Sequence, residues 1–312
     1  MKIFITGMAG MIGYHTAIQL HQSGHSVVGI DNFNDYYDVQ LKRDRAALLK
    51  QNYGIEVVEA DIITADYDTL LKDVDAVLHL AAYANPRHSL EYPQYYIDTN
   101  ITGTQKLIEG CEKNGVENVV YASSSCVMHG QPLPWNEVDR PSHQNNPYGW
   151  SKRANECQFM HSNIKNTSGL RFFTVYGPYG RPDMALFLFT KGIIDQTPII
   201  AFNNGDMIRD FTYVQDIVQG VEISLNNVAN NNGHEIYNIG RGEKVNLMDF
   251  IHHIEKKVGK EAIIDYRPKH PADVPATWSD TSKLQALGYQ PETSIEEGVS
   301  HFIDWYREYY NV

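Results

Sequence analysis

The chain opens with Lys2-Ile3-Phe4-Ile5-Thr6-Gly7-Met8-Ala9-Gly10-Met11-Ile12-Gly13, and this stretch decides the fold. Residues 2–6 form a short apolar run, and glycines follow with the spacing G-x-x-G-x-x-G. Such glycines permit a tight turn from a strand into a helix and let the backbone approach a pyrophosphate. The free N–H groups at the start of the helix favour the same anion. The stretch therefore predicts a strand, a phosphate-binding turn and a helix.

Short apolar runs and helical patterns alternate from this turn as far as residue 177. Further strands are expected at residues 26–31, 55–61, 76–82, 118–125 and 169–177. Helices are expected at residues 14–24, 37–51, 67–72, 93–115 and 148–162. This alternation predicts an α/β fold with a Rossmann-type, doubly wound parallel sheet covered by helices on both faces. Ligands of such sheets bind beyond the carboxyl ends of the strands.

The pattern changes after Gly177, where a loop rich in Gly and Pro is followed by shorter, mixed segments. We interpret residues 177–209 and 241–312 as a smaller mixed C-terminal substrate-binding lobe. Residues 1–176 form the dinucleotide-binding domain, and residues 210–240 return to it. A final amphipathic helix is expected at residues 294–310, with its aromatic side chains packed in the core.

Composition excludes several classes of partner. The formal net charge of −12 argues against a nucleic-acid or anionic-membrane surface. The three cysteines lack paired spacing, so we expect neither a disulfide framework nor a metal site. The same cysteine usage predicts a cytoplasmic location. The first residues have neither the length nor the order of a signal peptide. No run reaches the roughly 18 apolar residues of a membrane span.

Three strand ends carry side chains suited to a dinucleotide. Asp31 ends the second strand, at the offset of a carboxylate that accepts from the adenosine ribose, and this carboxylate favours NAD over NADP. Asp61 follows the third strand and is expected to meet the adenine end. Either aspartate could instead only cap a helix. The small residues of Leu80-Ala81-Ala82 let a cofactor lie close to the fourth strand.

A second constellation points to proton and hydride chemistry. Tyr148 and Lys152 are four residues apart at the start of an expected helix, hence on one face. A nearby ammonium is expected to lower the pKa of the phenol, which can then take a proton from a hydroxyl group. The preceding strand ends in serines, of which Ser124 is the candidate partner of the substrate oxygen and Ser125 the fallback. These serines could alternatively form only a capping turn.

The glycine turn, Asp31, Ser124, Tyr148 and Lys152 together resemble the extended short-chain dehydrogenase/reductase superfamily. Longer strings narrow the resemblance to the UDP-glucuronate 4-epimerases, across essentially the whole chain. The strings are DNFNDYYDVQLKRDRAALL, PRHSLEYPQYYIDTNITGT, YGWSKRANE, RFFTVYGPYGRPDMALF, GDMIRDFTYVQDI and DVPATWSDTSKLQALGYQPETSIEEGV. The resemblance implies NAD as the cofactor and a UDP-sugar as the substrate.

The resemblance also implies roles for single residues. Asn100 would brace the cofactor side, and Thr174 and Tyr176 would lie beside the sugar and the nicotinamide. Arg181 would bind the glucuronate carboxylate, with Arg87 as a second candidate. Each arginine could instead form only a surface ion pair. The expected cofactor site is Gly7, Gly10, Gly13, Asp31, Asn32, Asp61, Ile62, Leu80, Ala81, Ala82, Asn100, Tyr148 and Lys152. The expected substrate site is Arg87, Ser124, Ser125, Thr174, Arg181, Arg209 and Asp273, the last two holding UDP.

The chain departs from the resemblance at Cys126-Val127-Met128-His129-Gly130, where the family has a Val-Tyr-Gly turn, and at Ala272, where it commonly has glycine. Related dehydratases and decarboxylases carry an acid just after the catalytic Ser or Thr. Ser125 and Cys126 are not acids, which favours an epimerase.

Two other functions stay open at this point, 4-epimerisation of a neutral UDP-hexose or UDP-N-acetylhexosamine and a non-catalytic NAD-binding sensor. The helices at residues 93–115 and 148–162 resemble a dimerising pair, so a homodimer is expected.

Overall fold

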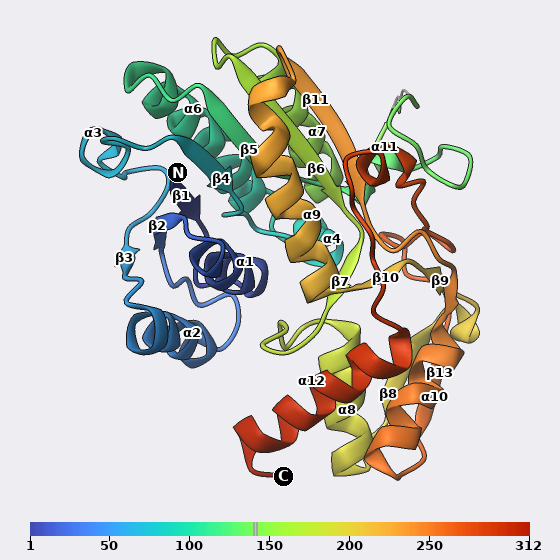
Figure 1. Ribbon diagram of the computed structural model, residues 1–312. Coiled ribbons are helices and arrows are strands. Elements are labelled where there is room, and N and C mark those ends of the chain that lie inside the picture. The colour runs from blue at the N-terminus through green and yellow to red at the C-terminus, as the bar shows by residue number, and fades with distance from the viewer. Residues whose placement is uncertain (140, 142) are drawn as a thin grey trace.

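Seven parallel strands form the central sheet of the computed structural model, which describes residues 1–139, 141 and 143–312 (Figure 1). The strand order is β11-β6-β5-β4-β1-β2-β3, and every pairing is parallel. The strands are β1 (Lys2–Thr6), β2 (Ser26–Asp31), β3 (Val57–Glu59), β4 (Ala76–His79), β5 (Asn118–Ser124), β6 (Asn166–Phe172) and β11 (His234–Ile239). The predicted Rossmann-type sheet is confirmed.

Helices cover both faces of this sheet because successive strand residues point to opposite sides. Ile3 and Ile5 pack in one core with α1 (Met11–Gln22), α2 (Val39–Tyr53) and α9 (Val214–Asn227). Phe4 packs in the other core with α3 (Tyr67–Leu70), α6 (Thr104–Lys113) and α7 (Pro147–Met160). The near-continuous apolar strands of the sequence follow from this double burial.

The helix expected at residues 93–115 contains an irregularity. After α4 (Pro86–Glu91), the chain forms α5 (Pro93–Tyr95), a π-helical segment η1 (Tyr96–Gly103) and then α6. Asn100 lies in the π-helical segment, where its side chain is fully buried. Wide helical turns of this kind often occur at functional sites because they redirect side chains.

The single strand expected at residues 169–177 is wrong. β6 ends at Phe172, and β7 (Thr174–Tyr176) leaves the sheet to pair with β10 (Phe211–Tyr213). The backbone changes partner between the two strands, because the N–H of Phe173 still bonds Ile239 while the N–H of Thr174 bonds Asp210. This exit carries the chain from the sheet towards the second lobe.

Most of the second lobe lies at the lower right of Figure 1, beyond β7 and β10, whereas its α11 (Ser282–Gln285) lies at the upper right and packs against β11. β8 pairs with β13 in parallel, and β9 pairs with β12 antiparallel. Its elements are α8 (Ala185–Asp195), β8 (Ile199–Phe202), η3 (Asn203–Gly205), β9 (Ile208–Arg209), β12 (Val245–Asn246), α10 (Leu247–Val258), β13 (Ile264–Arg267), α11 (Ser282–Gln285) and α12 (Ile295–Tyr310). The 3-10 turns η2 (Ser125–Met128) and η4 (Val228–Asn230) follow β5 and α9, respectively. The expected division of the chain into two lobes stays a proposal, with residues 1–176 and 210–240 in the first and residues 177–209 and 241–312 in the second. The pairing of β11 with β6 supports the return of residues 210–240 to the first lobe.

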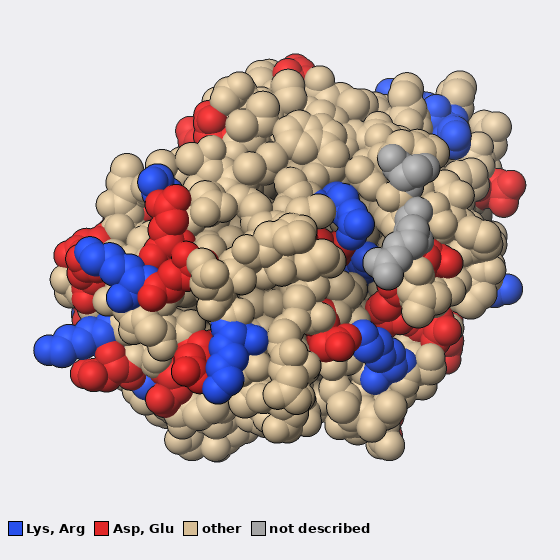
Figure 2. Space-filling view, turned by 90° about the horizontal axis from the view of Figure 1, so that it is seen from above, with Lys and Arg blue, Asp and Glu red and all other residues tan. Residues whose placement is uncertain are grey.

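The face shown in Figure 2 mixes basic and acidic side chains around its edge and near its middle, and it carries no continuous basic field among the described residues. None of the helices in the described part of the chain has the length and hydropathy that a membrane crossing requires.

Candidate active site

A cavity of about 910 Å³ lies at the carboxyl ends of the sheet strands and extends to the second lobe. Gly7, Asp31, Leu80 and Ser124 line it from the sheet side, and Asp273 lines it from the other lobe. Its size is at the upper end of ordinary ligand pockets. The topology therefore places the expected cofactor and substrate residues around one space.

The glycine turn has no room for side chains. Gly7 has a φ of +72°, and a Cβ there would lie 2.8 Å from the Ala81 nitrogen. A Cβ on Gly13 would lie 2.4 Å from the Gly7 oxygen, and one on Gly10 would lie 3.1 Å from it. Gly10 is the N-cap residue of α1. The turn therefore exposes backbone and a helix N-terminus to the cavity, as a bound pyrophosphate requires.

Asp31 lies at the end of β2 with its carboxylate nearly buried. Its oxygens accept hydrogen bonds from the N–H groups of Ala9, at 3.1 Å, and Phe33, at 2.9 Å. Burial raises the pKa of Asp31, although these two hydrogen bonds oppose the shift. The carboxylate is held rigidly against the glycine turn, at the place expected for the adenosine ribose.

Asp61 supports a neighbour instead of facing the cavity directly. Its carboxylate accepts from the Asn32 amide at 2.8 Å and from the N–H of Ile63 at 2.8 Å. Asn32 and Ile62 line the cavity here. The carboxylate therefore orients the Asn32 amide, and its expected role at the adenine end stays a prediction.

The catalytic candidates come together where β5 meets α7. Ser124 is the last residue of β5, and Tyr148 and Lys152 lie in the first turns of α7. The Asn146 side chain caps this helix by accepting from the N–H of Gly149 at 2.8 Å. Ser124 hydrogen-bonds Tyr148, and Lys152 Nζ donates to the Ala122 carbonyl at 3.0 Å. The helix cap thus fixes the position of the phenol relative to the strand.

Burial dominates the electrostatics of Tyr148 and Lys152. Burial raises the pKa of Tyr148, whereas the hydrogen bond from Ser124 and the charge of Arg181 lower it. Burial also lowers the pKa of Lys152 to about 7. Desolvation therefore opposes the expected lowering of the Tyr148 pKa, and in this structure it outweighs the nearby charges.

Asn100 connects the segment after β4 to α7. Its Oδ1 accepts from the N–H of Tyr83 at 2.9 Å, and its Nδ2 donates to the Tyr83 carbonyl and to Ser151 Oγ, both at 2.9 Å. The side chain is fully buried. Asn100 therefore joins the segment after β4 to α7, and its expected role on the cofactor side stays a prediction.

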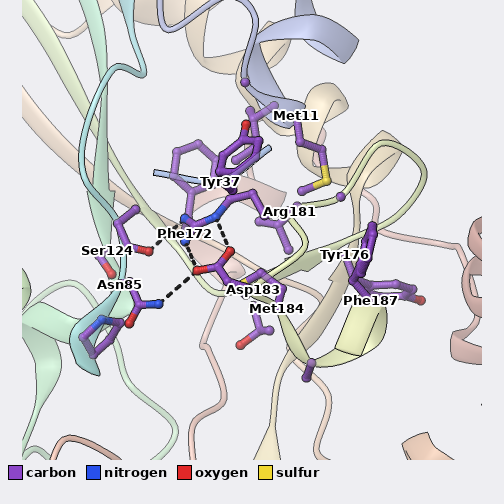
Figure 3. Close-up of a pocket in the computed structure, with 18 of the residues that line it drawn as sticks. Met11, Tyr37, Asn85, Ser124, Phe172, Tyr176, Arg181, Asp183, Met184 and Phe187 are labelled. Atoms are coloured by element: carbon purple, nitrogen blue, oxygen red, sulfur yellow. Dashed lines mark hydrogen bonds and ion pairs between the residues drawn. The ribbon is translucent and has the colours of Figure 1, made fainter. Parts of the chain in front are cut away.

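Arg181 lies in the loop after β7 and lines the cavity, close enough to Tyr148 for its charge to lower the phenol pKa. Its guanidinium is already paired with Asp183 through two hydrogen bonds (Figure 3). Sequence reasoning missed Asp183, although the Arg-Pro-Asp spacing in a loop was a signal for such a pair. Thr174 and Tyr176 also line the cavity, and the Tyr176 ring packs in addition against Phe211 and Phe250.

The far end of the cavity contains a second charged group. Arg87 Nη2 forms an ion pair with Asp273 at 2.7 Å, and the guanidinium stacks 3.9 Å above the Phe202 ring. Arg209 lines the same end, and burial lowers its pKa. Arg87 therefore lies with the two residues expected to hold UDP, and Phe202 is a lining residue that the sequence did not suggest.

The departures from the resemblance have local explanations. Ser125 and Cys126 line the cavity, and burial raises the pKa of the Cys126 thiol, which makes it a poor nucleophile. Val127 and Met128 are fully buried, and the Met128 sulfur accepts from Arg171 at 2.9 Å. Within the described residues, no group of three His, Cys, Asp or Glu side chains could hold a metal ion.

Comparison with known proteins agrees with this geometry. A sequence model described as "NAD dependent epimerase/dehydratase family" matches residues 3–240. Protein CapI of Staphylococcus aureus is 41% identical, with 99% of each chain covered. UDP-glucuronate 4-epimerase of Thermodesulfobacterium geofontis is 40% identical, with 97% of this chain and 95% of that protein covered.

A solved structure extends the similarity to three dimensions. UDP-glucuronic acid 4-epimerase from Bacillus cereus, in complex with UDP-glucuronic acid and NAD, superposes with a TM-score of 0.94 at 34% identity. The comparison covers 99% of this chain and all of that one. From its sequence and its fold, this chain belongs to the NAD dependent epimerase/dehydratase family.

Proposed function

We propose that this protein is an NAD-dependent 4-epimerase that interconverts UDP-glucuronate and UDP-galacturonate through a 4-keto intermediate. The observation that carries the proposal is the presence of Tyr148 and Arg181 in one cavity, with the arginine charge acting on the phenol. A base for a sugar hydroxyl and a cation for a sugar carboxylate are the two groups that this substrate requires. Relatives named UDP-glucuronate 4-epimerase support the choice.

NAD fits the cradle formed by the glycine turn. The close approach at Gly7 and Gly13 leaves backbone N–H groups open to a pyrophosphate. Asp31 would meet the adenosine ribose, and its negative charge disfavours a 2′-phosphate. The small residues Ala81 and Ala82 let the nicotinamide half lie against the end of β4.

The chain contributes proton transfer and positioning. Tyr148 would take the proton of the C4 hydroxyl, Ser124 would hydrogen-bond the same oxygen, and Lys152 would hold the cofactor ribose and supply positive charge near the phenol. Bound NAD would supply the hydride acceptor and donor for C4, on opposite faces of the rotated sugar. Arg209 and Asp273 would hold the UDP moiety during this rotation, while Thr174 and Ser125 would line the sugar.

The acids of the cavity favour epimerisation over dehydration. Dehydration needs a carboxylic acid that can deliver a proton beside the sugar. Asp183 is the acid next to Arg181, and although burial alone would raise its pKa, the charge and hydrogen bonds of Arg181 hold the pKa below its usual value. An ionised, paired carboxylate is a poor proton donor.

The direct test is incubation of the purified protein with UDP-glucuronate, without added reductant, followed by chromatography and mass spectrometry. We expect a product of unchanged mass that co-elutes with UDP-galacturonate, and a far slower formation of it by the Tyr148→Phe variant. A product lighter by one carbon dioxide would make the protein a decarboxylase. Turnover of UDP-glucose without turnover of UDP-glucuronate would establish the neutral-hexose alternative. The structural similarity to MoeE5 in complex with UDP-glucose and NAD is the reason to test that alternative.

Arg181 is proposed to protect the 4-keto intermediate, which is a β-keto acid and can lose carbon dioxide. An ion-paired carboxylate is held in its charged form and in a fixed orientation. Arg181→Ala should therefore raise the share of UDP-pentose among the products. The matched control is Arg267→Ala, which removes an exposed arginine that also pairs with an aspartate two residues away. An unchanged pentose share in Arg181→Ala would remove this role.

A homodimer and a cytoplasmic location are further proposals. Leu90, Tyr92, Tyr95 and Met160 are large apolar residues that are between 43% and 50% exposed. They lie on or next to the two helical segments expected to dimerise, and burying them in an interface would remove this area from water. Light scattering after size-exclusion chromatography tests the dimer. The three free cysteines are consistent with a reducing compartment.

A further inference from the structure

The Nε–Nη2 edge of the Arg181 guanidinium binds the carboxylate of Asp183, which lies in the same loop. Arg181 Nε donates to Asp183 Oδ1 at 2.9 Å, and Nη2 donates to Asp183 Oδ2 at 2.6 Å. Nη1 donates to the Ala84 carbonyl at 2.9 Å. The bidentate edge, which matches a carboxylate best, is therefore closed to a ligand in this arrangement.

Two further donors hold Asp183 from outside the loop. Asn85 Nδ2 and the Tyr36 hydroxyl each donate to Asp183 Oδ2 at 2.9 Å. Figure 3 shows the Asn85 amide directed at the Asp183 carboxylate, on the side away from the guanidinium. All four residues line the cavity, and the Asp183 side chain remains 26% exposed. The pair is therefore accessible to a bound sugar.

A sugar carboxylate that enters this site competes with the Asp183 carboxylate for the Arg181 guanidinium. It can take the bidentate edge of Arg181 only if Asp183 gives it up, because one edge accommodates one carboxylate. Asp183 would not be left without partners, since the hydrogen bonds from Tyr36 and Asn85 can remain. Two carboxylates beside one guanidinium would still repel each other.

We propose that Asp183 is an internal competitor of the sugar carboxylate, which weakens the binding of UDP-uronates and keeps the site able to accept neutral UDP-hexoses. This inference rests on the proposed function and concerns its substrate range. With a neutral sugar the Arg181–Asp183 pair stays closed and no buried charge is left unpaired. A uronate carboxylate instead has to take the Nε–Nη2 edge from Asp183 or bind the remaining Nη hydrogens beside a second carboxylate, and either arrangement weakens its binding.

The test replaces Asp183 with asparagine, which keeps an acceptor oxygen for Tyr36 and Asn85 but removes the charge. We expect Asp183→Asn to lower the KM and Kd for UDP-glucuronate about 3- to 5-fold, the upper part of the range that the loss of a competing, partly exposed ion pair allows. The same constants for UDP-glucose should change less than about twofold. Asp265→Asn is the matched control, because Asp265 pairs with Arg267 two residues away at 2.7 Å, outside the cavity.

A second variant keeps the test independent of the folding of Asp183→Asn. Asp183→Ala removes the carboxylate altogether, and it should also lower the KM for UDP-glucuronate, by a smaller factor because Tyr36 and Asn85 then lose their acceptor. A rise in the KM for UDP-glucuronate in both variants would identify Asp183 as a permanent support of Arg181 and overturn the proposal. Equal changes for both sugars would overturn it too.

The two hypotheses fail differently. If the wild-type protein binds UDP-glucuronate but does not epimerise it, the proposed function fails, while the calorimetric Kd values of both nucleotides still decide the role of Asp183. If the wild type epimerises UDP-glucuronate and Asp183→Asn binds it more weakly, the proposed function stands and the competitor role is refuted.

Discussion

Replacing Glu156 with glutamine should destabilise the protein strongly and disturb the strand end that carries Ser124. Glu156 is fully buried in α7, one helical turn beyond Lys152. Its carboxylate accepts from Arg171 Nε at 2.8 Å and Nη2 at 3.0 Å, and from Ser123 Oγ at 2.7 Å. Burial alone would raise the pKa of Glu156, but the hydrogen bonds and charge of Arg171 hold it below its usual value. The carboxylate is therefore ionised and paired.

The magnitude follows from the burial of the partner. The Arg171 side chain is 3% exposed, so glutamine would leave an uncompensated charge in the interior. Breaking a buried ion pair from one side costs roughly 3–5 kcal/mol. For a chain of 312 residues, with an unfolding entropy of about 2.1 cal/mol/K per residue, this corresponds to a fall in Tm of about 5–8 °C.

Circular dichroism at a saturating concentration of NAD would measure the change, and urea titration would supply the free energy of unfolding. The matched control is Glu109→Gln, which breaks an exposed pair with Lys106 at the same i,i+3 spacing as the pair between Arg153 and Glu156. An exposed pair of this kind contributes about 0–1 kcal/mol. If Glu156→Gln lost no more stability than Glu109→Gln, the assignment of a stabilising charge to this buried site would be refuted.

Three other substitutions test the site. Gly13→Ala should lower the affinity for NAD at least about tenfold, and Gly10→Ala should lower it less, because the added Cβ would lie 2.4 Å from the Gly7 oxygen at Gly13 and 3.1 Å from it at Gly10. Equal losses of affinity in fluorescence titrations would contradict this steric explanation. Tyr148→Phe should lower kcat by about 10²–10⁴-fold with unchanged NAD content, and substantial residual turnover would assign the base elsewhere. Lys152→Met should abolish turnover yet raise the free energy of unfolding by about 1–3 kcal/mol at pH 6. Burial lowers the pKa of Lys152 in the folded protein to about 7, against an ordinary value of 10.5. Between these two pH values the unfolded state binds more protons than the folded state, so the free energy of unfolding of the wild type rises with pH. The stability advantage of Lys152→Met should thus shrink from pH 7 towards pH 10 in urea titrations, and an advantage that grows would contradict the reasoning.

The sequence by itself determined the sheet and the candidate catalytic pair, because both depend on short-range patterns. The glycine spacing from Gly7 to Gly13 specifies a turn that no other residue type fits, and the alternating apolar runs specify strands buried on both faces. Tyr148 and Lys152 share one face of a helix whatever the rest of the chain does. Such features need only a few neighbouring residues, so the amino-acid sequence is sufficient to predict them.

Tertiary structure alone decided the partners of the charged side chains. Arg87 pairs with Asp273, 186 residues away, and Asn100 meets Tyr83 and Ser151 only because a π-helical segment turns it inward. The pKa of Tyr148 rises because the surrounding chain excludes water from it, which no local motif encodes. These contacts depend on how loops from distant segments pack, and their energies depend on the burial that this packing creates.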